Sequence, residues 1–410
     1  MRILVISACV PFPPVGGGPL RTYHVLRALA ACNDVTLLGF TFGAAPEPAP
    51  FPLRVITVPW TPPVLYDEMQ GADPERSSRA VQILSSGAEP WFVSFYASHA
   101  METAVQQLVT ERFDLIWLED SDMGRFLPWL PANVSKIIDF QNVYALMSRR
   151  AAEAAETGKR AVLMREADRT LRFEKHVAQN CDLGIVCSDL EATAAGELLG
   201  LSRIEVIPNG VDTAYFSTHN NEESPYSLLF TGTMNHPPNE EAVLYLVADI
   251  LPKIREHFPA VELHVVGREP GTRIRSLATP NVVIHGAVAD VRPYFAAASV
   301  VVAPILSGGG TRLKILEAAA SSKAIVSTTF GAEGLGLTDN EHLLIGDSPE
   351  AFAQAVVDLL RQPSKRRLVG RRAREASLKF DWRHVEEKTA ATVGSFSFKP
   401  ERGVAGLRRK

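Results

Sequence analysis

The sequence predicts an α/β protein built from two doubly wound, Rossmann-like domains. Three observations support this fold class. The chain has 410 residues, which is too long for one average domain. Short β-branched runs alternate with longer helical patterns along the whole chain, as in parallel α/β architecture. The runs are apolar throughout, which is typical of strands that helices cover on both faces of a sheet.

The apolar runs fall into two sets, one for each predicted domain. In the first half, the predicted strands are Arg2–Ser7, Asp34–Phe40, Leu53–Val58, Phe113–Leu118, Ser135–Phe140 and Leu183–Cys187. In the second half, they are Ser227–Thr231, Val261–Val266, Val282–His285, Val300–Pro304 and Ala324–Thr328. One long helical pattern, rich in Arg and Ala, is expected from about Val143 to Gln179 near the end of the first domain.

The domain boundary is predicted just after the turn signal Ile207-Pro-Asn-Gly-Val-Asp212, where the polar stretch Ser217–Pro225 is the best linker candidate. We therefore expect one domain over residues 1–212, a second over 213–380, and a C-terminal segment over 381–410. Trp382 is expected to anchor the last helix in an apolar groove. The polar tail after Phe396 ends in three basic residues and is expected to be mobile.

Composition excludes several classes of protein. A formal net charge of −4 gives no support to nucleic-acid binding, which usually needs a basic face. The four cysteines make no CxxC pair, and we interpret them as buried free thiols in a reducing cytosol. The first apolar run is too short for a signal peptide, and no run is long enough to span a bilayer. The protein is therefore expected in the cytoplasm.

The first candidate site is a glycine run, Gly16 to Gly18, that joins the first strand to the first helix. Glycines there let backbone N–H groups approach an anion beside a helix N-terminus, although a flexible turn explains them equally well. The run is not a dinucleotide-binding fingerprint. Arg21 occupies the place of the third glycine, and the next predicted strand ends in Phe40 rather than in an acid. His24, on the helix that follows, either faces a cleft or covers buried surface.

The second candidate is the stronger one. A predicted buried strand from Val300 runs into three glycines and then into a helix whose first turns are expected to carry Thr311, Arg312, Lys314 and Glu317. Amides of the glycines and of the helix start would meet phosphate oxygens, and Arg312 or Lys314 would neutralise a departing diphosphate. The Glu317 carboxylate would accept hydrogen bonds from a pair of sugar hydroxyls. The alternative is a structural Lys314–Glu317 pair, worth only a few tenths of a kcal/mol.

An acidic motif, Asp120-Ser-Asp122, follows the strand predicted at Phe113–Leu118. Paired carboxylates in this pattern can hold a divalent metal, and such a metal can stabilise a diphosphate. A three-residue pattern arises often by chance, and the metal interpretation leaves the whole second half of the chain unexplained. We therefore expect no metal. The same acids, with the neighbouring Glu119, are candidates for holding hydroxyls of an acceptor.

Basic residues are concentrated in the long helical pattern. They are Arg149, Arg150, Lys159, Arg160, Arg165, Arg169, Arg172 and Lys175. A solvated helix face explains them, and the alternative is contact with anionic lipid headgroups.

Taken together, these motifs resemble glycosyltransferase family 4. The resemblance covers almost the whole chain and rests on the order and separation of six elements. They are Pro-Pro-Val-Gly-Gly-Gly after Phe12, Ile-Pro-Asn-Gly-Val-Asp ending at Asp212, Phe230-Thr-Gly-Thr-Met-Asn-His-Pro-Pro-Asn239, Val265-Val-Gly267, Asp290-Val-Arg-Pro-Tyr294 and the Gly-Gly-Gly-Thr-Arg-Leu-Lys-Ile-Leu-Glu-Ala element. The resemblance implies the GT-B fold, with two Rossmann-like domains facing across a cleft and a last helix that crosses back to the first domain.

The same resemblance implies a retaining transfer of a sugar from a nucleotide-diphosphate sugar to a hydroxyl. The acceptor would bind the N-terminal half and the nucleotide sugar the C-terminal half, with no cofactor. Implied partners are the nucleotide sugar and a saccharide or lipid-linked saccharide acceptor from cell-surface polysaccharide or glycolipid assembly. With a lipid-linked acceptor, the protein would attach to the anionic inner face of the membrane.

The chain departs from the family pattern at three places. Gly309 stands where the family often has the first of two glutamates, while Glu317 keeps the second. Gly232 is followed by Thr233 where many members carry Gly-Arg and then Lys-Gly, so Arg312 and Lys314 are expected to take over the diphosphate. Gln141 or Asn142 stands where the family often has a histidine of the acceptor domain.

These considerations give the predicted site. The catalytic candidates are Arg312, Lys314, Gln141 and Asn142. The donor-binding candidates are Gly17, Gly18, Gly232, Thr233, Gly309, Gly310, Thr311 and Glu317. The acceptor-side candidates are His24, Glu119 and Asp139. Two rival functions stay open: a sugar-nucleotide epimerase of the same fold, and a catalytically silent sugar-nucleotide-binding subunit.

Overall fold

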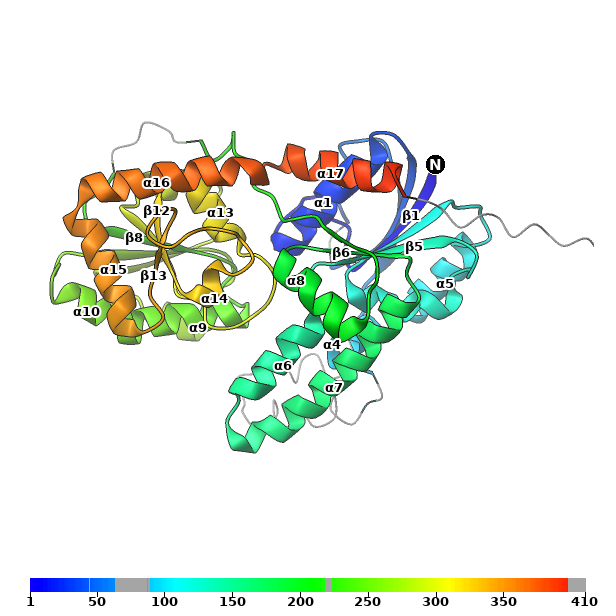
Figure 1. Cartoon of the computed structure of the whole chain (residues 1–410), viewed down its shortest axis with the longest axis horizontal. Helices are drawn as coiled ribbons and strands as arrows, with labels where there is room; N and C mark the ends of the chain where they lie inside the picture. The colour runs from blue at the N-terminus through cyan, green and yellow to red at the C-terminus, as the bar shows by residue number, and fades with distance from the viewer. Residues whose placement is uncertain (44, 63–86, 88, 218–222, 397–410) are drawn as a thin grey trace, which may run out of the picture. The chain divides into compact units, whose positions relative to one another are not determined.

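The computed structural model describes residues 1–43, 45–62, 87, 89–217 and 223–396 (Figure 1). These residues form two compact units. The first comprises Met1–Ile207 together with the chain from Glu386 onward, and the second comprises Pro208–Val385. The predicted basic tail lies outside the described residues, as does most of the predicted linker between Ser217 and Pro225.

The first unit is built on a parallel sheet of seven strands in the order β3-β2-β1-β4-β5-β6-β7. The strands are β1 Arg2–Ser7, β2 Asp34–Thr41, β3 Arg54–Pro59, β4 Leu115–Glu119, β5 Ser135–Phe140, β6 Leu183–Val186 and β7 Ile204–Val206. Each predicted strand of the first half is present within two residues of its expected ends. β7 is an additional strand at the sheet edge, only partly buried, and too short to form a recognisable apolar run.

Helices cover both faces of this sheet, with α1 on one side and α5, α6 and α7 on the other (Figure 1). The helices are α1 Gly17–Ala30, α4 Trp91–Ser94, α5 His99–Leu108, α6 Tyr144–Ala154, α7 Thr157–Gln179 and α8 Asp189–Ala194. A 3₁₀ segment, Ser121–Trp129, follows β4, and a π-helical turn, Ala195–Leu199, continues α8.

The long helix predicted from Val143 to Gln179 is wrong as a single element. It is two helices, α6 and α7, which contact each other along their length. Ala155 and Glu156 between them adopt extended backbone angles. Thr157 and Gly158, which are weak helix formers, follow directly, so the helical pattern breaks there although its Arg and Ala content does not change.

The second unit repeats the plan with six parallel strands in the order β10-β9-β8-β11-β12-β13. The strands are β8 Ser227–Thr231, β9 Glu262–Val266, β10 Val282–Gly286, β11 Val300–Ala303, β12 Ala324–Ser327 and β13 Leu344–Ile345. Its helical elements are α9 Pro237–Tyr245, a π-helical turn Leu246–Ile250, α10 Leu251–Arg255, α11 Thr272–Arg275, α12 Arg292–Ala297, α13 Leu313–Ala320, α14 Thr329–Ala332, α15 Pro349–Arg361, α16 Pro363–Ser377 and a 3₁₀ turn Leu378–Phe380. The two-residue β13 was not predicted.

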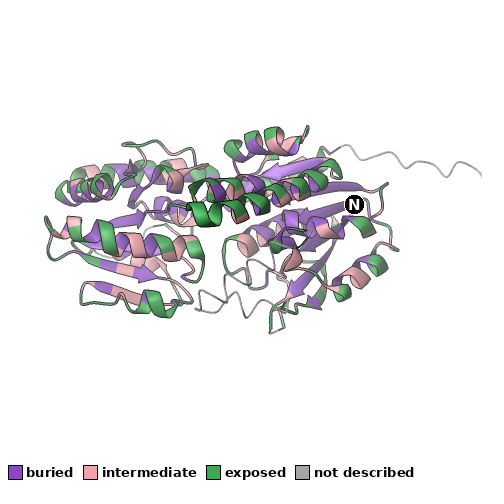
Figure 2. Cartoon of the chain, turned by 90° about the horizontal axis from the view of Figure 1, so that it is seen from below, coloured by how far each residue is buried: buried purple, intermediate pink, exposed green. Residues whose placement is uncertain are grey.

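Both sheets are doubly wound, as predicted. In each, the first three strands of the unit run outward in one direction and the later strands in the other. The order therefore reverses between β1 and β4 in the first unit and between β8 and β11 in the second. Ligands of open α/β sheets bind beyond the carboxyl ends of the strands at this point. The central strands of both sheets are buried while the outer faces of the helices are exposed (Figure 2).

The last described helix, α17 Trp382–Gly394, begins in the second unit and ends in the first. Trp382 is buried, and a Cβ added to Gly210 would lie 2.5 Å from its ring. This contact is the predicted anchor of the helix. The prediction of buried cysteines holds for Cys187 alone. Cys32 is exposed because it follows the end of α1 at the surface, and Cys9 and Cys181 are partly exposed.

Candidate functional site

The strongest candidate site lies in the second unit, at the carboxyl end of β11. This strand is fully buried between β8 and β12. Gly308 and Gly310, which follow it, have φ of 106° and 64°, a backbone conformation that favours glycine. α13 then begins without any side chain capping its first amides. The helix start and the glycine loop together offer backbone N–H groups to an anion.

The helix begins later than predicted. Leu313 is the first residue of α13, so Thr311 and Arg312 belong to the loop before it rather than to its first turn. The Arg312 guanidinium folds back onto this loop, donating to the carbonyl oxygens of Gly309 and Gly310, and lies 5.0 Å from the centre of the Phe330 ring. Arg312 satisfies carbonyls of the loop and holds its shape.

Lys314 and Glu317 lie on α13, three residues apart, and both are half-buried. The Lys314 ammonium donates to Oδ1 of Asn239 at 2.7 Å and lies 4.0 Å from the centre of the Phe230 ring. Among the described residues, neither side chain has an ion-pair partner, and Glu317 has no hydrogen-bond partner for its carboxylate. The alternative of a closed Lys314–Glu317 ion pair is therefore not what the structure contains.

Burial acts on both groups in the direction that disfavours charge. It lowers the pKa of Lys314 to about 7, with Glu317 opposing and Arg312 adding to the effect. It raises the pKa of Glu317 to about 7, with Lys314 opposing. An ammonium and a carboxylate are thus partly desolvated without being neutralised by a protein partner. Such a pair at a sheet's switch point is typical of a binding site that a ligand completes.

A second loop meets this element from β8. Gly232 and Thr233 follow the strand, and the Asn239 amide donates to the Thr233 carbonyl at 2.9 Å. A Cβ on Gly232 would lie 2.8 Å from Nδ2 of Asn239 and 3.0 Å from Nζ of Lys314, so only glycine fits. Arg268, just after β9, donates to the Thr233 hydroxyl at 3.4 Å. Neither Asn239 nor Arg268 was predicted.

In the first unit, the glycine run after β1 lies close to Gln141, which follows β5. Gly16, with φ of 105°, immediately precedes α1, and no side chain caps the helix. A Cβ on Gly18 would lie 2.8 Å from Oε1 of Gln141. The Gln141 amide in turn donates to Glu119 at 3.2 Å and to the Thr22 hydroxyl at 3.4 Å.

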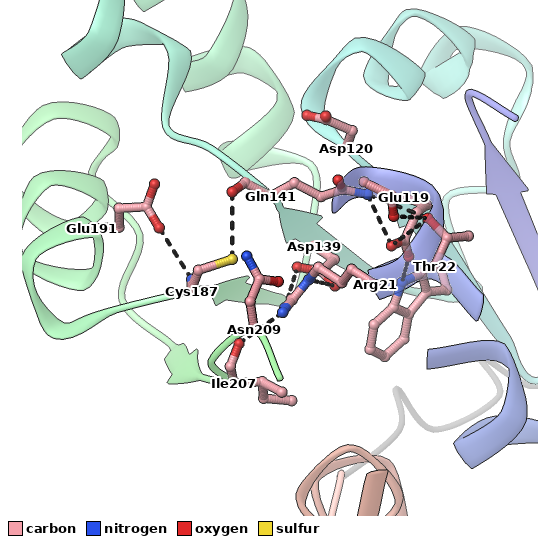
Figure 3. Close-up of polar contacts among 12 residues, drawn as sticks. Arg21, Thr22, Glu119, Asp120, Asp139, Gln141, Cys187, Glu191, Ile207 and Asn209 are labelled. Carbon is pink, nitrogen blue, oxygen red and sulfur yellow. Dashed lines mark hydrogen bonds and ion pairs between the residues drawn. The ribbon is translucent and has the colours of Figure 1, made fainter. Parts of the chain in front are cut away.

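Below this loop lies a buried ion pair between Arg21 and Asp139 (Figure 3). Arg21 is 1% exposed and Asp139 fully buried. The guanidinium donates through Nε and Nη2 to the two carboxylate oxygens at 3.0 and 2.8 Å, and through Nη1 to the carbonyl of Ile207 at 2.9 Å. Burial acts against the charge, but Asp139 raises the pKa of Arg21 overall. The pair ties α1 to β5 and to the end of the sheet.

Glu119, at the end of β4, is also fully engaged. It accepts from the Thr22 hydroxyl at 3.2 Å and from the Trp117 indole at 2.7 Å, besides Gln141. Burial, together with the charge of Asp139, raises the pKa of Glu119 to about 8. His24 is nearly buried on α1, where Nδ1 lies 2.5 Å from a carboxylate oxygen of Glu386 on α17. The contacts of Glu119 and His24 therefore stabilise the first unit.

The Asp120-Ser-Asp122 segment turns inward after β4. Asp120 has φ of 78° and accepts from the backbone of Ser121 and from the Tyr144 hydroxyl, at 2.7 and 3.1 Å. Asp122 is 4% exposed, and one of its carboxylate oxygens has no partner among the described residues. Burial raises the pKa of Asp120 to about 7 and that of Asp122 well above its usual value. Within the described part of the chain, no three potential ligands group around a metal position.

The predicted residues thus fall into two clusters, one in each unit. Gly232, Thr233, Gly309, Gly310, Thr311, Arg312, Lys314 and Glu317 belong to the second unit. Gly17, Gly18, His24, Glu119, Asp139, Gln141 and Asn142 belong to the first. Thr311 accepts from the Asn209 side chain at 2.9 Å, while Asn142 is half-buried and has no side-chain hydrogen bond with described residues. The roles of these residues toward a substrate stay predictions.

With this geometry in hand, comparison with known proteins is informative. Residues 225–362, which include the whole β8–β11 site, match the family model of glycosyl transferases group 1. The phosphatidyl-myo-inositol mannosyltransferase of Mycolicibacterium smegmatis is 31% identical over 209 residues, 48% of this chain and 53% of that protein. The Mycobacterium leprae protein of the same name is 31% identical over 229 residues, 52% and 60% of the two chains. The chain spans about half the length of the curated relatives it matches.

Solved structures match over nearly the whole chain. Sucrose-phosphate synthase from Thermosynechococcus elongatus superposes with a TM-score of 0.69 at 19% identity, covering 96% of this chain and 98% of its own. HepE of Anabaena, solved in complex with UDP-glucose, gives 0.66 at 16% identity, covering 97% and 100%. These likenesses, with the two doubly wound sheets, show a two-domain Rossmann-like fold of the GT-B type. Of the described helices, none is both long enough and apolar enough to span a bilayer.

Proposed function

We propose that this chain is a retaining glycosyltransferase of family 4, which transfers a sugar from a nucleotide-diphosphate sugar to a hydroxyl. Three findings support the class: the matched family model, the mannosyltransferase relatives and the two-domain fold. The observation that carries the proposal is the state of Lys314 and Glu317. Both are desolvated at the switch point of the second sheet, and among the described residues neither has an ion-pair partner.

A nucleotide-diphosphate sugar supplies what these two side chains lack. Its phosphates would receive the Lys314 ammonium together with the amides of the glycine loop and the start of α13. Its ribose hydroxyls would donate to the Glu317 carboxylate. Negative charge on the diphosphate grows as the bond to the sugar breaks, so Lys314 and Arg312 would stabilise the transition state more than the ground state. We propose that no metal or other cofactor takes part.

The acceptor is a hydroxyl compound, and we propose a lipid-linked one. The named relatives act, by their names, on phosphatidyl-myo-inositol. In the first unit, the exposed basic residues Lys159, Arg160, Arg165 and Arg172 lie along α7. A groove of about 500 Å³ runs between α6 and α8, and its lining includes Leu146, Leu190 and Leu198 together with the charged residues Arg149, Arg150, Glu153 and Glu197. A groove that combines cationic and apolar side chains would suit a lipid headgroup and its chain, and we propose that the protein binds peripherally to the cytoplasmic face of the membrane.

Vesicle binding tests the membrane part of this proposal. The chain should bind anionic vesicles at low salt and release them as salt rises, because headgroup attraction is screened. Replacing Lys159 and Arg160 together by Glu should weaken this binding. The matched control replaces the exposed pair Arg371 and Arg372 on α16 by Glu and should bind as wild type. Equal binding to neutral and anionic vesicles would leave the basic face of α7 as a solvated surface.

Product analysis with a panel of nucleotide sugars tests the reaction itself. We expect release of nucleoside diphosphate and a new glycoside of retained configuration when an acceptor is present, and loss of both in Lys314→Ala. A changed sugar nucleotide formed without any acceptor would identify an epimerase. Nucleotide-sugar binding without transfer or hydrolysis would identify a silent binding subunit, and either result would reject the proposed activity.

A further inference from the structure

Asn239 connects the two loops of the proposed donor site. It is the third residue of α9, after Pro237 and Pro238, which preset the backbone of a helix start. Its side chain donates through Nδ2 to the carbonyl of Thr233 at 2.9 Å and accepts through Oδ1 from Nζ of Lys314 at 2.7 Å. A carbonyl can only accept and an ammonium can only donate, so these two partners fix which way the amide points.

The surroundings leave the Lys314 ammonium little freedom. On one side it lies 4.0 Å from the centre of the Phe230 ring, and on another it meets Asn239. Gly232 approaches so closely that a Cβ there would be 3.0 Å from Nζ. The Gly232 loop is itself held, since a Cβ on Gly267 would fall 1.6 Å from the Gly232 carbonyl oxygen. An ammonium has three N–H donors, and Asn239 occupies one of them, which leaves donors for an anion.

Asn239 fixes the position of this cation without neutralising it. A carboxylate at the same place would pair with Lys314 and repel an incoming phosphate, whereas an amide oxygen accepts the same hydrogen bond and carries no charge. The other charged or titratable groups that face Lys314 are Glu317 on its own helix, Arg312 just before that helix, and His236 just before α9. Of these, only Glu317 is an acid, and it is not within ion-pair distance of Lys314.

We infer that Asn239 is a positioning residue that holds the Lys314 ammonium, still charged, at the place where the diphosphate of the sugar nucleotide binds. The inference rests on the proposed function and adds to it the residue that replaces a direct basic contact from the Gly232–Asn239 loop. That loop carries no Lys or Arg, and through Asn239 it recruits the cation from α13 instead.

Three variants of the full-length chain test the inference: Asn239→Leu, Asn239→Asp and, as a matched control, Asn235→Leu, which changes an exposed Asn in the same loop. The measurements are the affinity for nucleoside diphosphate, kcat and KM for the donor sugar, and the dependence of donor kcat/KM on pH from about 6 to about 9. Lys314 must be charged to bind phosphate, so kcat/KM should fall as pH rises through its pKa.

Asn239→Leu should weaken diphosphate binding and lower donor kcat/KM by about tenfold or more, because the ammonium loses its fixed position. Its alkaline limb should move to lower pH, because burial then acts on Lys314 without a hydrogen-bond acceptor. Asn239→Asp should move the limb to higher pH, since a carboxylate favours the charged ammonium, while still weakening diphosphate binding. The control should match wild type. A general loss of structure could not move the alkaline limb of the pH profile to lower pH in Asn239→Leu and to higher pH in Asn239→Asp.

The positioning role would be overturned if both Asn239 variants kept the wild-type pH profile and the wild-type affinity for diphosphate while Lys314→Ala lost diphosphate binding. The proposed function would then still stand. Unchanged diphosphate binding in Lys314→Ala would instead reject the proposed donor site itself. If Asn239→Leu does not fold, the direction of the limb shift in Asn239→Asp decides alone, because Asp has nearly the shape of Asn.

Discussion

The carboxyl ends of the two sheets carry similar charged residues, which differ in whether they have partners inside the protein. In the first unit, the polar groups beside the glycine run have partners inside the protein: Arg21 pairs with Asp139, and the Glu119 carboxyl meets three hydrogen-bond donors. In the second unit, Lys314 has only a neutral amide and an aromatic ring, and Glu317 has no hydrogen-bond partner among the described residues. Two sheets with the same winding thus carry different networks. The network of the first unit is complete because its members bond to one another, and that of the second unit is open because Lys314 and Glu317 have no ion-pair partner among the described residues.

This difference separates two uses of buried charge. A buried ion pair with all its hydrogen bonds made stabilises one arrangement of the chain, and removing one partner is costly because the other stays buried and unpaired. A desolvated charge without a counter-charge does not stabilise the fold and gains its partner only when a ligand binds. Mutations in the first network should therefore act on folding, and those in the second on binding and turnover.

The largest expected effect is on stability in the first unit. Arg21→Met leaves the fully buried Asp139 carboxylate without its guanidinium, and breaking such a pair costs about 3–5 kcal/mol. Unfolding in urea, followed by tryptophan fluorescence, is a suitable measurement because all the tryptophans except Trp382 belong to this unit. Wild-type stability in this variant would show that the pair is dispensable and would remove the contrast between the two units.

The same substitution at Lys314 should give the reverse result. Lys314→Met removes a partly desolvated cation and keeps the apolar contact with Phe230, so the free energy of unfolding should change by less than about 1 kcal/mol. The value of kcat should fall by about a hundredfold, because the departing diphosphate loses a charged donor. Arg312→Ala should also slow turnover. A variant that is unstable but turns over normally when folded would place Lys314 among the structural residues.

A smaller loss is expected at Glu317. In the proposed scheme Glu317→Gln would remove charge-assisted hydrogen bonds to the ribose and should lower donor kcat/KM roughly tenfold to a hundredfold. Because the pKa of Glu317 is raised to about 7, wild-type donor kcat/KM should fall as pH drops through neutrality and the carboxylate gains a proton. This acid limb should vanish in the Gln variant, which cannot titrate. An unchanged pH profile with full activity would mean that the nucleotide binds elsewhere.

The smallest expected effect follows metal removal. Transfer should continue in excess chelator, because the Lys314 ammonium and the loop amides would face the diphosphate in the proposed scheme. Asp122→Asn should be close to neutral, since the Asp122 carboxyl is buried, its pKa is raised, and one oxygen has no partner among the described residues. Activity that disappears with chelator and returns with manganese or magnesium would restore the metal interpretation of the acidic segment.

The fold could be predicted from the sequence because each buried strand is visible within its own short segment of the chain. Buried strands such as Arg2–Ser7 and Ser227–Thr231 are continuous apolar runs, and their number and spacing indicate two doubly wound sheets. The short edge strands β7 and β13 are only partly buried and leave no such run. The break between α6 and α7 was missed because Thr157 and Gly158 interrupt the Arg- and Ala-rich helical pattern for only two residues.

The sequence could predict which site residues lie together only where they belong to one continuous segment. Lys314 and Glu317 are three residues apart on one helix, so their shared face follows from helical geometry. Asn239 is 75 residues from Lys314, and Arg21 is 118 residues from Asp139. Those pairs depend on which strands are neighbours, and strand order is set by the whole sheet. The sequence therefore indicated charged candidates but gave no means of telling that Asp139 has an ion-pair partner within the protein, whereas Lys314 has none among the described residues.

The most direct test of the account is a calorimetric titration of nucleoside diphosphates into wild type, Lys314→Met, and the double variant Lys314→Met/Glu317→Gln. The open network in the second unit predicts that at least one nucleoside diphosphate binds wild type. It also predicts that the single variant loses about tenfold or more in affinity and the double variant more again, with all three proteins unfolding alike. Wild-type affinity in the double variant would contradict the account, because the nucleotide would then bind without the two charges that the structure leaves open.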